Sequence, residues 1–251
     1  MTLDTYSIKK CSTNIKQSQV EFPLLLGKNV KREIIINDFK DYGSIAIFGG
    51  TGSGKTNFIH SLIYALMTKR ESNELQIICI DTKMSNSYTV FDQSQYFPKG
   101  VIPDIEHAIE AVLWCTQEMN SRYKTRQKQP AIFLIIDEFS DLMFSNKDIG
   151  DMLKKLATNG SFVGMYLIIS TSIPSKRVFT EELRLNIPGR VAFRLPNMFD
   201  SMYTLEILGA EKLYKSGEMI FRNTNYDYNI FEHLQVPETT IGDLEELIRG
   251  G

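Results

Sequence analysis

The fold of this chain is decided by one stretch, Ser44-Ile-Ala-Ile-Phe-Gly49-Gly-Thr-Gly-Ser-Gly54-Lys55-Thr56. It fits the pattern G-x-x-x-x-G-K-[ST] in full, with an apolar run before it and a helical pattern after it. Glycines let such a backbone curl so that successive N–H groups point inward, and the positive end of the following helix adds to their field. A chance glycine turn is disfavoured because motif and context agree. The stretch therefore predicts a phosphate-binding loop (P-loop) that binds a nucleoside triphosphate.

Each position of the loop receives an expected role. Lys55 is expected to reach the β- and γ-phosphates, which also gives it a catalytic role, and the Thr56 hydroxyl is expected to ligate Mg²⁺. ATP and Mg²⁺ are therefore the predicted cofactors. The residues expected to bind the nucleotide are Gly49, Gly50, Thr51, Gly52, Ser53, Gly54, Lys55 and Thr56.

A second apolar run, Ala131-Ile-Phe-Leu-Ile-Ile-Asp137-Glu138, ends in two carboxylates. In P-loop enzymes the first such acid holds the magnesium shell, and the second is placed to polarise the attacking water as a general base. We therefore assign Asp137 to the metal and Glu138 to catalysis. The alternative is a helix N-terminus that carries acidic residues, which is common. The P-loop upstream favours the functional interpretation.

The next apolar run ends in Ser170-Thr171-Ser172. A polar residue at the tip of this strand can sense the γ-phosphate in such folds, and we assign Thr171 to the nucleotide site on that basis. An ordinary strand-to-loop cap is an equally good interpretation of Thr171 and Ser172, and both stay open.

Apolar runs alternate with helical patterns along most of the chain, which predicts an α/β fold with a mainly parallel sheet and helices on both faces. Residues 1–20 are polar and are expected to form an extension or a linker before a domain at 21–251. Strands are predicted at 33–36, 44–48, 75–80, 131–136, 165–170 and 190–194, with a final pair at 218–221 and 227–231. Helices are predicted at 55–69, 104–123, 147–158, 178–186, 198–207 and 237–249.

The composition of the chain limits how it could contact DNA, which sites its cysteines could form and where in the cell it works. Its 251 residues carry a net charge of −2, so any contact with DNA has to be local rather than a general basic coat. Three cysteines without a CxxC pair disfavour a metal site or a disulfide framework and fit a reducing cytoplasm. The apolar runs fall well short of the ~20 residues that span a bilayer. We therefore expect a cytoplasmic location, with any membrane tether on a partner or on a longer parent chain.

The ordered motifs resemble the motor domain of the FtsK/SpoIIIE DNA translocases, which group with the HerA-like hexameric ATPases. The similarity runs from about Pro23 to Phe221, which is most of the chain. Leu24-Leu-Leu-Gly-Lys28 and Ile35-Ile-Asn-Asp38 are similar to the strand pair that precedes the family's P-loop. Besides these and the P-loop, the matching segments are Ile80-Asp-Thr-Lys83, Trp114-Cys-Thr-Gln-Glu-Met119 with Arg122-Tyr-Lys124, Asp137-Glu-Phe-Ser-Asp-Leu-Met143, Asn186-Ile-Pro-Gly-Arg-Val-Ala-Phe193 and Gly209-Ala-Glu-Lys-Leu213 through Gly217-Glu-Met219.

This resemblance implies a RecA-like P-loop NTPase fold, a hexameric ring and ATP hydrolysis at subunit interfaces. In the family the ring pulls double-stranded DNA, and in one branch it serves protein secretion. The partners implied are therefore ATP, further copies of the chain or tandem ATPase domains, and DNA or a secreted protein.

One segment departs from the family pattern. The family usually carries Thr-Gln-Arg-Pro-Ser after the strand that bears the two acids, whereas this chain reads Thr171-Ser-Ile-Pro-Ser175. Ile173 thus stands where an arginine is expected, and an arginine finger is worth ~10³–10⁵ in rate. Arg190 is our catalytic candidate for the missing cation, and a surface charge that ends a strand is an equally good interpretation of Arg190 and Arg194. The remaining candidate cations are Lys176 and Arg177.

Two functions follow from these observations. The first is an ATPase motor that translocates double-stranded DNA. The second is an ATPase domain like those of the type VII secretion proteins EssC and EccC, which hydrolyses weakly and recognises a protein substrate. The intact P-loop and the acidic pair favour the first, and Ile173 with the near-neutral charge favours the second.

Overall fold

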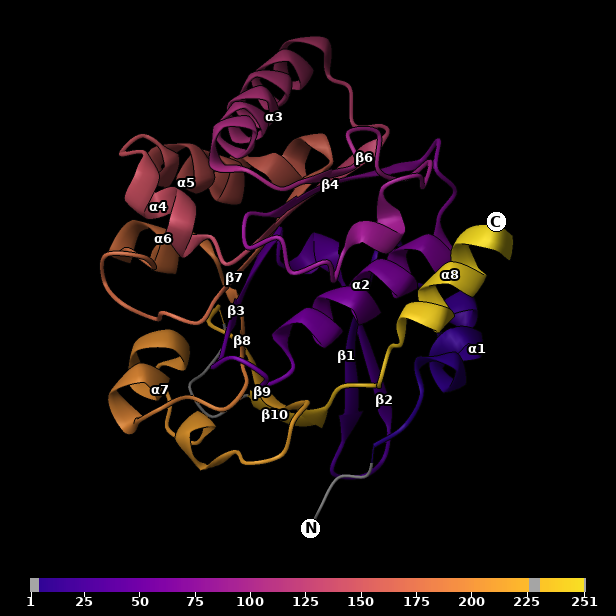
Figure 1. Cartoon of the computed structure of the whole chain (residues 1–251), viewed down its shortest axis with the longest axis vertical. Helices are drawn as coiled ribbons and strands as arrows, with labels where there is room; N and C mark the ends of the chain where they lie inside the picture. The colour runs from indigo at the N-terminus through magenta and orange to yellow at the C-terminus, as the bar shows by residue number, and fades with distance from the viewer. Residues whose placement is uncertain (1–4, 226–230, 251) are drawn as a thin grey trace. The chain divides into compact units, whose positions relative to one another are not determined.

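The computed structural model describes residues 5–225 and 231–250 (Figure 1). The chain divides into two compact units. Unit 1 comprises residues 1–42, 47–70 and 189–251, and unit 2 comprises residues 43–46 and 71–188. Each unit carries one part of the predicted site.

Unit 2 is built on parallel strands in the order β7-β6-β4-β5. Their sequences are nearly continuous apolar runs, because strands covered on both faces cannot alternate with polar residues. The pairing of β4 with β6 extends to Asp81 opposite Asp137, so two acids lie side by side at the carboxyl ends of these strands. The strands are β4 (Leu75–Asp81), β5 (Val101–Ile102), β6 (Ala131–Asp137) and β7 (Met165–Thr171).

The long helix of unit 2 is α3 (Ile105–Thr125), which begins where the Asp104 side chain accepts the N–H of His107 at 3.0 Å. It packs against α5 (Ile149–Asn159), which contacts β7 and α6 (Glu181–Asn186). The remaining helices of this unit are α4 (Ser140–Ser145), η3 (Thr89–Phe91) and η4 (Gly160–Val163).

Unit 1 is built on antiparallel strands in the order β2-β1-β10-β9-β8. Strand β3 (Ser44–Phe48) starts in unit 2 and continues into unit 1 at Ile47, where the Phe48 carbonyl accepts the N–H of Phe193 at 2.8 Å. The strands of the antiparallel set are β1 (Pro23–Asn29), β2 (Ile34–Asp38), β8 (Gly189–Ala192), β9 (Glu218–Asn223) and β10 (Phe231–Gln235).

Helices cover the strands of unit 1. Helix α2 (Lys55–Lys69) contacts β1, and α7 (Met198–Leu205) contacts β8. Figure 1 shows α2 and α7 on opposite sides of the strands of this unit. The remaining helical segments are α1 (Ser12–Gln17), α8 (Ile241–Gly250), η1 (Ile8–Cys11), η2 (Phe39–Asp41) and η5 (Ala210–Lys212).

The polar N-terminal segment forms η1 and α1 and packs within unit 1. Ile8, Cys11 and Ile15 are buried. The Ser12 hydroxyl lies 2.9 Å from the Tyr64 hydroxyl on α2, and the N–H of Ile8 donates to the Glu238 carbonyl at 2.9 Å. A domain boundary at residue 20 stays a prediction.

Most of the predicted elements are present. Both α2 and β3 have the predicted bounds, and the α/β class is confirmed, with parallel strands in unit 2 and antiparallel strands in unit 1. The first strand of the final pair lies within β9. Most of the second, at 227–231, falls outside the described residues, and the described strand β10 begins at Phe231. None of the described helices combines the length and the apolar character that crossing a membrane requires.

A substitution at Gly27 would test the packing of unit 1. It has φ +119° at a register shift in β1, and a Cβ there would lie 2.3 Å from the Gln235 carbonyl oxygen. We expect Gly27→Ala to lower the free energy of unfolding by about 2 kcal/mol or more, because it adds backbone strain and a clash with backbone. Urea denaturation checks this. Gly242→Ala on α8, where the nearest atom would be 3.7 Å away, is the control, and equal stabilities of the two variants would contradict the expectation.

Candidate functional site

The P-loop curls at positions where only glycine fits. Gly54, the residue before α2, has φ +120° and lies against Gly217, so that a Cβ on Gly54 would come within 2.9 Å of the Gly217 nitrogen. Any side chain at residue 54 would therefore push the loop away from the 214–217 turn.

Backbone bonds fix the outer side of the loop within unit 1. The N–H of Gly50 donates to the Arg194 carbonyl at 3.2 Å, just beyond β8. The N–H of Gly217 donates to the Ser53 carbonyl at 2.9 Å, and the Ser216 hydroxyl donates to the Gly52 carbonyl at 3.3 Å. These bonds hold the loop against the segment after β8 and the turn before β9.

The inner side of the loop suits an anion. The first bond within α2 runs from Phe58 N–H to the Gly54 carbonyl at 2.9 Å, so the N–H groups of residues 55–57 have no acceptor inside the helix. The Ser53 hydroxyl is buried and has no hydrogen-bond partner among the described residues. A phosphate group, rich in acceptor oxygens, fits these donors and the positive end of the helix.

Lys55 is buried within this loop. Its Nζ donates to the carbonyls of Gly49 at 2.8 Å and Gly50 at 3.3 Å, which lie at the start of the loop. The ammonium thus sits inside the loop, close to the groups that would face a phosphate.

Asn57 links the same helical turn to the C-terminal segment, because its side chain bonds to the Pro237 carbonyl at 2.8 Å and to the Thr239 N–H at 2.9 Å.

In unit 2, Glu138 lies in a pocket of donors at the end of β6, with a left-handed φ of +56°. Its Oε1 accepts from the Thr171 hydroxyl at 2.7 Å, from the Ser172 N–H at 2.8 Å and from the Ser140 hydroxyl at 3.0 Å. Its Oε2 accepts from the Ser172 hydroxyl at 2.8 Å and pairs with Lys83 Nζ at 3.2 Å.

These contacts set the charge of Glu138. Burial raises the pKa of its carboxyl, but the hydrogen bonds from Thr171, Ser172 and Ser140 outweigh burial and hold that pKa at about 2. The side chain is therefore ionised at neutral pH and accepts a proton poorly. Its role as a general base stays a prediction.

Asp137 precedes Glu138 and is held by two hydroxyl groups. The Tyr88 hydroxyl donates to Oδ2 at 3.0 Å, and the Ser170 hydroxyl donates to Oδ1. Burial and the charge of Asp137 raise the pKa of Tyr88 well above its usual value, so Tyr88 stays a donor. The neighbouring Asp81 accepts from the Ser85 hydroxyl at 2.7 Å, which uses part of its own acceptor capacity.

The predicted site residues thus fall into two groups. Unit 1 holds the whole P-loop, and unit 2 brings together Asp137, Glu138 and Thr171. The Thr171 hydroxyl bonds to Glu138, and its role as a sensor of the γ-phosphate stays a prediction. Sequence reasoning gave no role to the other partners of the acids, because nothing in their local pattern indicates them; they are Lys83, Tyr88, Ser140 and Ser170.

Arg190 lies away from the surface of unit 1. It is 2% exposed, and its Nη1 donates to the Thr204 carbonyl and to Glu206 Oε1, each at 3.0 Å. The interpretation of Arg190 as a surface charge is wrong, because β8 is covered by α7 and the guanidinium is buried. These contacts are those of a structural ion pair, and a catalytic role for Arg190 stays a prediction.

The other candidate cations are exposed. Arg194 follows β8 and borders the P-loop, whereas Lys176 and Arg177 follow β7 in unit 2. The guanidinium of Arg177 lies over the Phe144 ring, 5.5 Å from its centroid.

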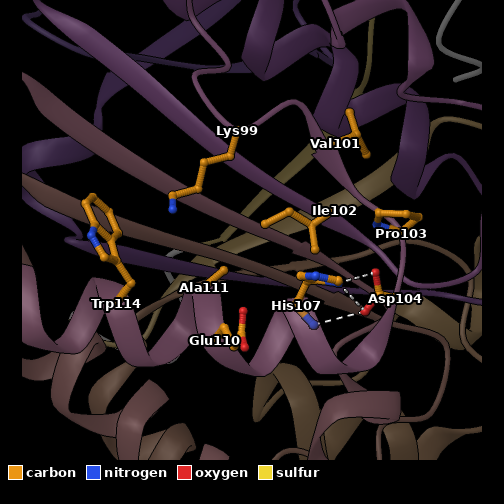
Figure 2. Close-up of a pocket in the computed structure, with 9 residues that line it drawn as sticks. All are labelled: Lys99, Val101, Ile102, Pro103, Asp104, His107, Glu110, Ala111 and Trp114. Carbon is orange, nitrogen blue, oxygen red and sulfur yellow. Dashed lines mark hydrogen bonds and ion pairs between the residues drawn. The ribbon is translucent and has the colours of Figure 1, made fainter.

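Unit 2 also contains a hollow of about 590 Å³ between the 99–103 segment and α3. Figure 2 shows the residues that line it. Lys99 lies over the Trp114 ring at 5.0 Å from its centroid, and His107 Nδ1 lies 2.8 Å from Asp104. The hydrogen bond and the charge of Asp104 raise the pKa of His107. None of the predicted site residues lines this hollow.

The pH dependence of stability tests the environment of Glu138. A carboxyl with a pKa of about 2 in the folded state and about 4.5 in the unfolded chain contributes stability above pH 4.5, and this contribution is lost as pH falls toward 2. We expect the stability difference between the wild type and Glu138→Gln to be a few kcal/mol at pH 7 and to shrink below pH 4.5. Denaturant unfolding from pH 7 to pH 3 checks this.

The matched control for this series is Glu245→Gln, which alters an exposed acid on α8 that pairs with Arg249. A difference between the wild type and Glu138→Gln that stays constant over the whole pH range would contradict the assigned environment.

Comparison with known proteins identifies relatives of the chain. The model of the FtsK/SpoIIIE family matches residues 10–128. The protein "DNA translocase FtsK" of Borreliella burgdorferi is 32% identical over 222 residues, which cover 79% of this chain and 28% of that protein. The chain spans about a third or less of the length of the curated relatives that it matches.

Solved structures share the fold. The cytoplasmic domain of the type VII secretion ATPase EccC of Thermomonospora curvata has a TM-score of 0.79 at 15% identity, covering 99% of this chain and 32% of that chain. The pCW3 conjugation coupling protein TcpA has a TM-score of 0.78 at 18% identity, covering 93% of this chain and 72% of that chain. The fold is therefore the RecA-like α/β fold of P-loop NTPases, and the sequence of the chain resembles the FtsK/SpoIIIE family over residues 10–128.

Proposed function

We propose that the chain binds ATP with Mg²⁺ and couples its hydrolysis to the translocation of double-stranded DNA through a ring of copies. The observation that carries the proposal is the P-loop, in which the buried Lys55, the unbonded Ser53 hydroxyl and the N–H groups of the first turn of α2 converge. The sequence match to the FtsK/SpoIIIE family supports the motor function. The related fold of TcpA, solved with an ATP analogue, supports nucleotide binding.

Lys55 and Thr56 would bind the phosphate end of the nucleotide. Lys55 would exchange the Gly49 and Gly50 carbonyls for phosphate oxygens, at little cost in geometry because its ammonium already lies inside the loop. The Thr56 hydroxyl and the Asp137 carboxylate would hold Mg²⁺. When bound, this ion would neutralise charge on the phosphates.

Glu138 would orient the attacking water. Its carboxylate has about four acceptor positions, and five contacts compete for them. Lys83 is the contact most easily displaced, because its side chain is 52% exposed whereas Ser172 and Thr171 are fixed at the end of β7. A water molecule would therefore take the place of Lys83 on Oε2.

The cation for an arginine finger would come from a neighbouring copy. Arg194, Lys176 and Arg177 are exposed and therefore able to reach outward, unlike the buried Arg190. We propose that the ring works in the cytoplasm, with any tether at the inner face of the membrane supplied by a partner or by a parent chain.

A second candidate function is a nucleotide-binding module that hydrolyses ATP weakly and recognises a secreted protein. The observation that favours it is Ile173, which is 44% exposed where the family pattern carries an arginine. The fold shared with the type VII secretion ATPase EccC is compatible with this function.

ATP turnover with and without duplex DNA, at matched salt, tests the motor function. We expect DNA to stimulate turnover in the wild type. Lys55→Ala should abolish it through lost phosphate binding, and Glu138→Gln should lower it at least ~100-fold through lost orientation of water. Arg249→Ala, which alters an exposed cation on α8, is the control.

An assembled ring that shows no turnover with DNA present would contradict the motor function. Binding of secretion substrates that carry a signal sequence, without DNA affinity at low salt, would instead support the second candidate. Salt-sensitive DNA binding would count against that candidate.

Removal of the metal tests the role of Asp137. We expect Asp137→Asn to weaken ATP binding about tenfold in Mg²⁺, because one charged ligand is lost. In EDTA the wild type and the variant should bind ATP equally. Calorimetric titration in both buffers checks this. An equal loss of affinity in both would show that Asp137 acts through its bonds to Tyr88 and Ser170 instead.

A further inference from the structure

Two acids lie side by side at the carboxyl ends of β4 and β6 in unit 2, where Asp81 is opposite Asp137 in the parallel register. Carboxylate oxygens are typical ligands of Mg²⁺, so either acid could bind the ion on chemistry alone. Asp81 is 4% exposed, and its hydrogen bonds indicate a different role.

The carboxylate of Asp81 binds the chain that follows it. Its Oδ2 accepts from the hydroxyl and the N–H of Ser85, at 2.7 and 3.1 Å, and its Oδ1 accepts from the Lys83 N–H at 3.3 Å. These bonds hold a tight turn in which Met84 and Asn86 have left-handed φ values of 47° and 56°. Residues other than glycine keep such a conformation only where surrounding contacts hold it. Asp81 therefore fixes the segment after β4.

The far end of this turn is anchored in the core of unit 2. Tyr88 is fully buried and precedes η3, and its carbonyl accepts the Phe91 N–H at 2.9 Å. The Phe91 ring is buried and stacks on the Phe97 ring, with 4.7 Å between the centroids. The Tyr88 side chain thus extends from a fixed point of the backbone.

Two hydroxyl groups from different elements hold the Asp137 carboxylate. Tyr88 donates to Oδ2 at 3.0 Å, and Ser170, near the end of β7, donates to Oδ1. A bond to each oxygen fixes the plane of the carboxylate and uses two of its about four acceptor positions. Mg²⁺ demands near-ideal octahedral geometry, so the orientation of a ligating carboxylate decides how well it binds the ion.

We infer that Tyr88 is a positioning residue for Mg²⁺: it holds the Asp137 carboxylate in the orientation that binds the ion, and Asp81 fixes the segment that carries Tyr88. The inference rests on the proposed role of Asp137 as a ligand. It divides the work of the two neighbouring acids, because Asp137 would face the ion whereas Asp81 organises the chain around it.

The affinity for ATP in Mg²⁺ and in EDTA, measured by calorimetry on the full chain, tests the inference. The proteins compared are the wild type, Tyr88→Phe, Asp137→Asn, the double variant of both and Tyr123→Phe. Tyr88→Phe keeps the buried ring and removes only the hydroxyl. Tyr123→Phe is the matched control, because it removes a tyrosine hydroxyl of the same unit that donates to the Asn159 carbonyl at 2.8 Å. Binding in EDTA also shows that each variant is folded.

We expect the gain in affinity from Mg²⁺, which is the Kd in EDTA divided by the Kd in Mg²⁺, to fall about threefold in Tyr88→Phe, as for the loss of one hydrogen bond. The Kd in EDTA should not change, and Tyr123→Phe should bind like the wild type. In the Asp137→Asn background, Tyr88→Phe should have no further effect, because the carboxylate that it orients is gone.

An equal loss of affinity in both buffers, or a full additional loss in the double variant, would overturn the positioning role of Tyr88. Two further results separate this role from the proposed function. If the wild type binds ATP equally in Mg²⁺ and in EDTA, the proposed Mg²⁺ site is itself wrong. If Mg²⁺ strengthens binding in the wild type and Tyr88→Phe retains the whole gain, only the role of Tyr88 is overturned.

Discussion

The hydrogen bonds that the P-loop makes with the segment after β8 and with the turn before β9 determine much of the arrangement of unit 1. Gly54 lies so close to Gly217 that a side chain at residue 54 would clash with the Gly217 backbone. The Ser53 carbonyl accepts the Gly217 N–H. The turn before β9 and the segment after β8 are thereby positioned by the loop. Side chains of both segments line a hollow of about 350 Å³ beside the loop.

In unit 2 the chemistry of one acid is set by the residues around it. Glu138 follows a buried strand, where burial by itself raises the pKa of its carboxyl. The end of β7 supplies two hydroxyl groups and an N–H to the carboxylate, which keeps it charged. The catalytic role of Glu138, assigned from the sequence pattern, stays a prediction.

The sequence predicted the elements whose signals are local. Both β3 and α2 have the predicted bounds because the P-loop motif joins them, and the acidic pair was located because it ends an apolar run. The antiparallel strands of unit 1 were not predicted as a set, because their order depends on pairing between β1 and β10, about 200 residues apart. Arg190 could not be assigned from sequence either, since its partner Glu206 lies 16 residues away across a helix.

The packing of the N-terminal segment could not be predicted from its composition, but it could have been predicted from the spacing of its apolar residues. Its polar character predicts an extension or a linker, yet Ile8, Cys11 and Ile15 follow helical spacing and are buried. Three apolar residues in a polar segment are enough to hold it against α2 when their spacing places them on one face.

The strand order of unit 1 also has a consequence for the synthesis of the chain. Unit 2 is almost continuous in sequence, whereas β1 lies beside β10, and the P-loop is bonded to residues 194, 216 and 217. A ribosome adds about 5–20 residues per second in chain order, so all of unit 2 is synthesised before these partners of the P-loop are. The P-loop, although it is made early, is therefore among the last parts of the molecule to reach its final conformation. A nascent chain would become competent to bind nucleotide only after its C-terminal strands have emerged.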